Sequence, residues 1–182
     1  MIQVDSTSRL LNNLLHWSTT QLDGAKINKQ DLFLEEILKD VVGALILMID
    51  NKQIEVINHH SDTNKKIHAD IGHVQVILNN LLSNAIKFTP EKGTIEIQYS
   101  EGNKMLNLHI INSGSEISPE KIDEILNFDK RLISEKGTGL EEGTGLGLLL
   151  VKQFLFDNNG KLQILNSPKG GAEFIVSFEK AK

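Results

Sequence analysis

Apolar residues recur along the chain with two periods, one typical of helices and one typical of strands. We predict helices over residues 6–22, 32–48, 70–88, 118–127 and 146–157. The signals are helical spacing of apolar residues, a capping serine followed by proline, or an almost continuous apolar run. The helix over residues 70–88 has to end before Pro90, because the residue that precedes a proline avoids the helical region.

Alternation with period two, or a short apolar run, predicts strands over residues 54–57, 66–69, 94–99, 105–111, 162–165 and 172–178. The turn at residues 101–103 joins two of these strands into a hairpin, and the last two strands form a second hairpin. Residues 128–143 are charged, contain glycine and lack periodicity, so we predict a long loop. We expect an α+β fold: a two-layer sandwich of a mixed, mostly antiparallel sheet with about three helices on one face, preceded by one appended helix.

The appended helix has a short apolar stripe, formed by Leu10, Leu11, Leu14, Leu15, Trp17 and Leu22. Residues 24–28 separate it from the rest of the chain. Such a stripe is typical of a helix that pairs with a partner helix, but it would also suit a helix that packs on its own domain.

Composition narrows the class of protein. The chain has 182 residues, 40% of them hydrophobic, which suits one good core. No segment has the roughly 18 or more uninterrupted apolar residues that span a bilayer, and no signal peptide is recognisable at the N-terminus. The absence of cysteine excludes disulfides and thiolate metal sites. The net charge of -5 argues against a general nucleic-acid surface, and no two histidines are spaced as a helical zinc pair.

One face of the predicted helix over residues 70–88 carries Asn80, Asn84 and Lys87, opposite the apolar face. This could be an ordinary solvated face. However, asparagine is a poor helix former, so two asparagines four residues apart call for a reason. Amide oxygens can ligate Mg²⁺, and a lysine one turn on can meet a phosphate group.

Three glycines, Gly143, Gly145 and Gly147, precede the buried helix over residues 146–157. They fit neither a P-loop, which needs Gly-Lys-Ser/Thr, nor a dinucleotide fingerprint, because Leu148 stands where the third glycine would be. Glycines allow close approach of the backbone to a ligand, and a helix N-terminus attracts anions.

The stretch from Asn80 to Pro90 (NLLSNAIKFTP) resembles the N box of sensor histidine kinases, in the ATPase superfamily shared with gyrase, MutL and the heat-shock ninety chaperone. Gly143 to Leu148 (GTGLGL) is similar to the G2 box of this family. Phe128 stands near the expected F box, and Gly170 to Phe174 resembles the last glycine box. The likeness covers about residues 30 to 180, with the motifs in the order of the family.

The resemblance implies a site for ATP and Mg²⁺. Asn84 would coordinate Mg²⁺, Asn80 would help to hold metal or phosphate, and Lys87 would contact phosphate. The residues Gly143, Thr144, Gly145, Leu146, Gly147 and Leu148 would close a mobile loop on the triphosphate. Lys130, Arg131 or Lys136 from that loop could reach the γ-phosphate, and the resemblance does not choose among them.

The base-binding pattern departs from the family, which has Asp-x-Gly-x-Gly where this chain has Asn112 to Glu116 (NSGSE). The resemblance places Asn112, Gly114 and Ile117 at the nucleotide. Asn112 keeps an acceptor for the adenine amino group but loses the charge, at a cost of about 1 to 2 kcal/mol. Glu116 replaces a glycine and would be strained if that position needs positive φ.

By resemblance, residues 1–24 are the C-terminal part of a dimerisation helix and residues 28–182 an ATP-binding catalytic domain. The expected function is to supply the γ-phosphoryl group of Mg-ATP to a histidine on the dimerisation helices. His16 has no neighbouring carboxylate and is expected to be a surface residue, so the chain alone should not phosphorylate itself.

The expected partners are the protein's own dimerisation domain, a homodimer partner and a response regulator, without nucleic acid or direct membrane contact. A cytoplasmic location follows, alone or as the cytoplasmic part of a membrane-bound sensor. The alternatives are a degenerate nucleotide-sensing or dimerisation module, and a serine kinase of the same superfamily.

Overall fold

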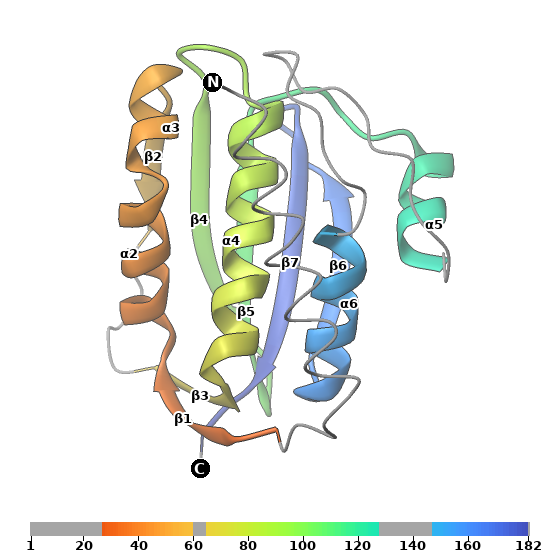
Figure 1. Cartoon of the computed structure of the whole chain (residues 1–182). Coiled ribbons are helices and arrows are strands. Elements are labelled where there is room, and N and C mark those ends of the chain that lie inside the picture. Colours follow the sequence, from red (N-terminus) through yellow and green to blue (C-terminus); the bar gives the residue numbers. More distant parts are fainter. Residues whose placement is uncertain (1–26, 60–64, 128–146, 182) are drawn as a thin grey trace.

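A five-stranded mixed sheet forms one layer of the molecule (Figure 1). The computed structural model describes residues 27–59, 65–127 and 147–181. The strands, in the order β2-β4-β5-β7-β6, are β2 (Glu55–Asn58), β4 (Thr94–Glu101), β5 (Met105–Asn112), β7 (Ala172–Glu179) and β6 (Lys161–Asn166). Only the β2–β4 pair is parallel in this sheet, and both predicted hairpins are present as the antiparallel pairs β4–β5 and β6–β7.

Helices cover one face of this sheet. They are α2 (Leu34–Ala44), α4 (Ile71–Phe88) and α6 (Gly147–Asp157), which lie side by side in Figure 1. A shorter helix, α3 (Ile46–Asn51), follows α2 in the chain. Another, α5 (Pro119–Asn127), contacts β6. Alternate strand residues such as Leu108 and Val176 meet the apolar face of α4 in one continuous core. The predicted α+β sandwich is confirmed.

Two details of the prediction were wrong. Residues 29–33 form a strand, β1 (Lys29–Phe33), which pairs with β3 (Lys66–Asp70) in a separate two-stranded sheet. The predicted helix over residues 32–48 therefore begins later, and it is broken at Leu45 between α2 and α3. Leu45 and Ile49 keep their apolar positions across the break, so periodicity alone could not reveal it.

Three predicted features lie wholly or partly outside the described residues. They are the appended helix, the boundary between residues 24 and 28, and the loop at 128–143. Within the described part of the chain, no helix has both the length and the apolar character needed to cross a membrane.

The start of α4 is tied to the end of α6 through Asn158, whose side chain is fully buried. Asp70 caps α4 by accepting from the N–H groups of Gly72 and His73 at 2.9 and 3.2 Å. Asn158 Oδ1 accepts from the N–H of Asp70 at 2.8 Å, and Asn158 Nδ2 lies 3.0 Å from His73 Nδ1. The two helices therefore run antiparallel, which brings the middle of α4 to the start of α6.

Candidate functional site

The polar face of α4 lies opposite its buried face. Asn80, Asn84 and Lys87 are all partly exposed. The opposite face is buried, with Val74, Ile77, Leu78, Leu81, Leu82, Ala85 and Ile86. Asn80 Nδ2 donates to the carbonyl of Val76 at 2.8 Å, which leaves its Oδ1 directed away from the helix. An amide oxygen held in this way can accept from a donor or ligate a hard cation.

The first residue of α6 lies against this oxygen. A Cβ added to Gly147 would lie 2.5 Å from Asn80 Oδ1, so a side chain there would displace the Asn80 amide. The first N–H groups of a helix have no partner within it and carry positive potential, which suits an anion. Leu148 packs on the core and anchors this first turn. The structure therefore brings Asn80 together with Gly147, as the sequence motifs imply.

Several residues that the sequence analysis singled out lie outside the described residues. They are Gly143, Thr144, Gly145, Leu146, Lys130, Arg131 and Lys136, together with Phe128 and His16. Their predicted roles stay predictions.

Asn112, the residue expected to meet the adenine amino group, is the last residue of β5. Its side chain is only 3% exposed. With the amide nitrogen toward the neighbouring carbonyl, Nδ2 donates to the oxygen of Ala172 at 3.1 Å and Oδ1 accepts from the N–H of Gly114 at 3.0 Å. The amide thus uses one donor and one acceptor on the chain itself, and it keeps one N–H and one lone pair for another group.

Three backbone segments pack tightly around Asn112. Gly171 has a φ of +84°, and a Cβ there would overlap the backbone oxygen of Asn112. A Cβ on Gly114 would overlap the backbone oxygen of Phe88, the last residue of α4. Gly114 thus lets the segment after β5 approach the carboxyl end of α4, and Gly171 lets the chain before β7 approach the backbone of Asn112.

The segment after β5 is held by a side chain that the sequence analysis missed. Asn166 of β6 accepts from the N–H of Ile117 at 2.9 Å and donates to its carbonyl at 2.8 Å. Asparagine is uncommon in strands, which was the available signal. Glu116 is exposed and is not among the residues with positive φ, so the strain considered for it is absent.

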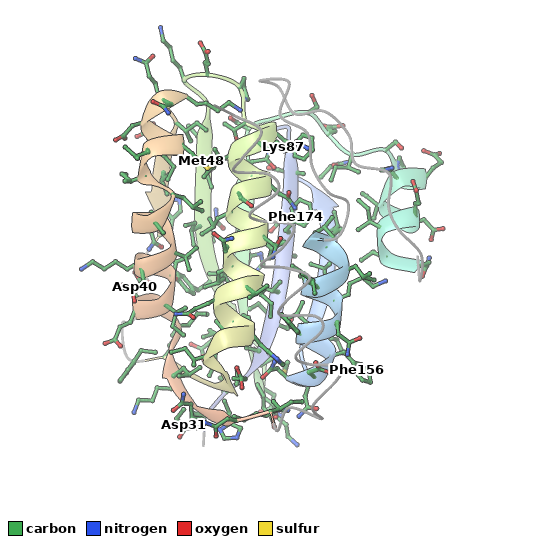
Figure 2. The ribbon with its side chains drawn as sticks, in the orientation of Figure 1. Asp31, Asp40, Met48, Lys87, Phe156 and Phe174 are labelled. Carbon is green, nitrogen blue, oxygen red and sulfur yellow. The ribbon has the colours of Figure 1, made fainter. Side chains whose placement is uncertain are left out.

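The carboxyl end of α4 is capped by Lys52, which the sequence analysis also missed. Lys52 Nζ donates to the carbonyls of Ile86 and Lys87 at 2.9 and 3.0 Å. Lys87 lies at this end of the helix (Figure 2), with its Nζ 4.9 Å from the centroid of the Phe88 ring. Its ammonium therefore lies over the ring of Phe88.

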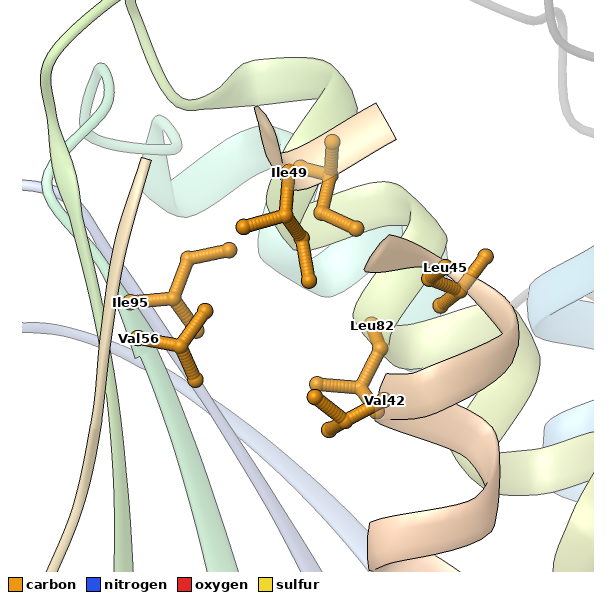
Figure 3. Close-up of a pocket in the computed structure, with 7 residues that line it drawn as sticks. Val42, Leu45, Ile49, Val56, Leu82 and Ile95 are labelled. Carbon is orange, nitrogen blue, oxygen red and sulfur yellow. The ribbon is translucent and has the colours of Figure 1, made fainter. Parts of the chain in front are cut away.

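One hollow in the described part of the molecule does not suit a nucleotide. It lies between α2, α3, α4 and the sheet (Figure 3), and its lining is wholly apolar: Val42, Leu45, Ile49, Val56, Leu82, Ile86 and Ile95. No polar group there could recognise a base or a phosphate.

The donor set at α4 fits magnesium better than zinc. Among the described residues, no group of three His, Cys, Asp or Glu side chains could hold a metal ion. Mg²⁺ is commonly bound by one or two protein oxygens together with water and substrate phosphates. Asn80 and Asn84 offer two amide oxygens of this kind, one turn apart on α4.

Comparison with known proteins gives the site a family context. A family model described as histidine kinase-, DNA gyrase B-, and HSP90-like ATPase matches residues 69–182. The sensor protein KdpD of Escherichia coli is 31% identical over 174 residues, which is 95% of this chain and 19% of KdpD. The autoinducer 2 sensor kinase/phosphatase LuxQ of Vibrio harveyi is 29% identical, over 93% of this chain and 20% of LuxQ. The chain thus spans about a fifth of these relatives.

Solved structures agree in fold. The catalytic domain of histidine kinase ThkA has a TM-score of 0.73 at 24% identity, with 85% of this chain and 99% of that domain covered. Full-length ShkA in complex with AMPPNP has a TM-score of 0.78 at 23% identity, with 96% of this chain and 36% of ShkA covered.

The packing around Gly171 predicts a difference between two adjacent glycines. Gly170 and Gly171 both have positive φ, but a Cβ on Gly170 would meet no neighbouring atom. Gly170→Ala should cost about 1 to 2 kcal/mol of unfolding free energy from backbone strain alone. Gly171→Ala should cost at least about twice as much, because its Cβ also collides with backbone. Urea denaturation measures both, and equal losses would contradict the packing described.

The hydrogen bonds of Asn112 predict that an aspartate is not tolerated there as an isostere. In Asn112→Asp, a carboxylate oxygen would face the carbonyl of Ala172, which should cost about 1 to 3 kcal/mol at neutral pH. Burial should raise the pKa of the new carboxyl, so the loss should shrink below about pH 5, where the protonated group can donate, and should grow as pH rises.

Denaturation curves at several pH values test this, with the exposed Asn103→Asp as the control. An Asn112→Asp variant as stable as the control across the range would refute the assigned amide contacts.

Proposed function

The chain belongs to the histidine kinase-, DNA gyrase B- and HSP90-like ATPases, as an ATP-binding domain of the sensor histidine kinase type, and from this membership we propose its role in phosphoryl transfer. It supplies the γ-phosphoryl group of Mg-ATP to a histidine on the dimerisation helices of a two-component sensor kinase. The observation that carries the proposal is the contact between Asn80 Oδ1 and Gly147 at the start of α6.

The phosphates bind between α4 and α6. The free N–H groups of the first turn of α6 face the anion, and Gly147 permits the close approach. Lys87 contributes a cation from the last turn of α4. Lys130 and Arg131, which lie outside the described residues, are proposed to supply further positive charge to the γ-phosphate.

Asn84 is the proposed magnesium ligand, with Asn80 as the second amide. Both lie on the same face of α4, one turn apart. Mg²⁺ held by these amides would supply positive charge that offsets the charge of the phosphates. The side chains position the ion and the phosphates, which is the main contribution of protein to this reaction.

Asn112, Gly114 and Ile117 form the base end of the site. Asn112 presents its remaining N–H and lone pair to the purine edge, and both are neutral groups. A neutral hydrogen bond is weaker than one to a carboxylate, so adenine binding is retained with reduced affinity.

The partners follow from the same proposal. The chain works with its own dimerisation helices, a homodimer partner and a response regulator, on the cytoplasmic side of the cell. Support comes from a structure of histidine kinase ThkA in complex with response regulator protein TrrA, which has a TM-score of 0.71 and covers 98% of this chain at 22% identity.

A second candidate, a degenerate nucleotide-sensing module, is favoured by the engagement of the Asn112 amide with the chain itself. It predicts nucleotide binding without any transfer, even when the dimerisation helices and their histidine are supplied. Transfer of label from γ-labelled ATP to such helices separates the two candidates.

The proposed metal role predicts that Mg²⁺ strengthens ATP binding through Asn84. Calorimetric titration with ATP should show at least about tenfold tighter binding in Mg²⁺ than in EDTA, or about 1.4 kcal/mol. Asn84→Ala should remove most of this gain. Asn79→Ala, an exposed position on another face of α4, should keep it.

Two results would count against the proposal. Absence of ATP binding at millimolar nucleotide would remove the kinase assignment for this chain. A full magnesium effect in Asn84→Ala would remove only the metal role.

A further inference from the structure

The sheet face opposite the helices carries a linked serine, histidine and glutamate. Ser100 Oγ lies 2.7 Å from His109 Nε2, and His109 Nδ1 lies 2.7 Å from Glu173 Oε1. The three residues come from the adjacent strands β4, β5 and β7. Gln98 and Ile175 lie directly opposite His109, so Ser100 and Glu173 reach the imidazole from its diagonal neighbours.

The hydrogen bonds have one consistent direction when the imidazole is neutral. The Glu173 carboxylate can only accept, so His109 Nδ1 carries the hydrogen and Nε2 carries the lone pair. Asn107 Nδ2 donates to Ser100 Oγ at 3.1 Å, which leaves the hydroxyl hydrogen of Ser100 to point at Nε2. This is the arrangement in which a histidine, oriented by a carboxylate, can take the proton of a serine.

The three side chains differ in their exposure to solvent. The side chains of His109 and Glu173 are 19% and 16% exposed, whereas Ser100 is exposed. Glu96, the carboxylate on the same face of β4 as Ser100, is engaged with Lys169 at 3.2 Å and His59 at 3.3 Å. Glu173 is therefore the carboxylate that orients His109, and the serine oxygen is open to a substrate.

We propose that Ser100 is an activated nucleophile, with His109 as its general base and Glu173 as the group that orients the base. The site would react with acyl esters that have a good leaving group. Because Ser100 stands on an open sheet face, a small acyl ester can reach it from solution. This activity is separate from nucleotide binding, which takes place on the helix side of the molecule.

The reaction transfers an acyl group in two steps. Ser100 Oγ forms a bond to the carbonyl carbon while its proton passes to His109 Nε2. The bond to the leaving oxygen then breaks, and the leaving group takes that proton. Water attacks the acyl-serine in the second step, gives a proton to Nε2, and releases the carboxylic acid as Ser100 regains its hydrogen. Asn107 Nδ2 lies beside Oγ and can donate to the oxyanion of either step.

The test uses the whole 182-residue chain and p-nitrophenyl acetate at pH 7. We expect a burst of about one p-nitrophenolate per chain, followed by slow turnover, with the acetyl group located on Ser100 by peptide mass spectrometry. Ser100→Ala should lose the burst, and Glu173→Gln should slow it about tenfold or more because His109 loses the carboxylate that orients it as a base.

Matched controls keep the result specific. Ser177→Ala changes a serine of the same sheet face, opposite Asn107 on β7, and should keep the full burst. Saturating ATP should leave the burst unchanged, since the nucleotide site is on the other face. Circular dichroism confirms that each variant is folded. A burst absent from the wild type, undiminished in Ser100→Ala, or traced to acetylated lysine would overturn the proposal.

Discussion

The antiparallel contact between α4 and α6 is the constraint on which the site depends. Asn158 fixes one end of this contact by bonding to the cap of α4, and Gly147 permits the close approach at the other end. Between these two points the helices have no freedom to slide, so the start of α6 is held against Asn80. The core beneath them, where Leu78 and Val151 are both fully buried, makes the arrangement rigid. A helix N-terminus and an amide oxygen are thereby fixed side by side, which is why the phosphates are proposed to bind there.

The base end of the site depends on backbone packing of the same kind. Gly171 and Gly114 remove the side chains that would separate β7, the segment after β5 and the end of α4. Asn112 then bridges two of these backbones with its amide, a task that a carboxylate could not perform because it cannot donate to Ala172. The departure from the aspartate of the family thus has a structural reason in this chain. In the proposed site, the Asn112 amide would offer the purine edge a neutral partner.

Much of this arrangement could be predicted from the sequence, since it rests on local patterns. The apolar stripe of α4, the hairpin at residues 101–103 and the asparagines at 80 and 84 depend on spacing alone. Long-range contacts could not be predicted in the same way. Lys52 and Asn166 reach the site from residues distant in the chain, and no local pattern links them to it. β1 was missed because most of its five residues are polar and its partner, β3, follows 32 residues after its end.

The two faces of the sheet carry different chemistry, with the nucleotide site among the helices and the Ser100 cluster on the open side. The central claim concerns the first of them. A crystal structure of the chain with Mg²⁺ and a non-hydrolysable ATP analogue tests it most directly. The account predicts a metal ion about 2.1 Å from Asn84 Oδ1, phosphate oxygens at the first turn of α6, and the purine beside Asn112. An analogue bound elsewhere, or a metal that is not held by Asn84, would contradict it.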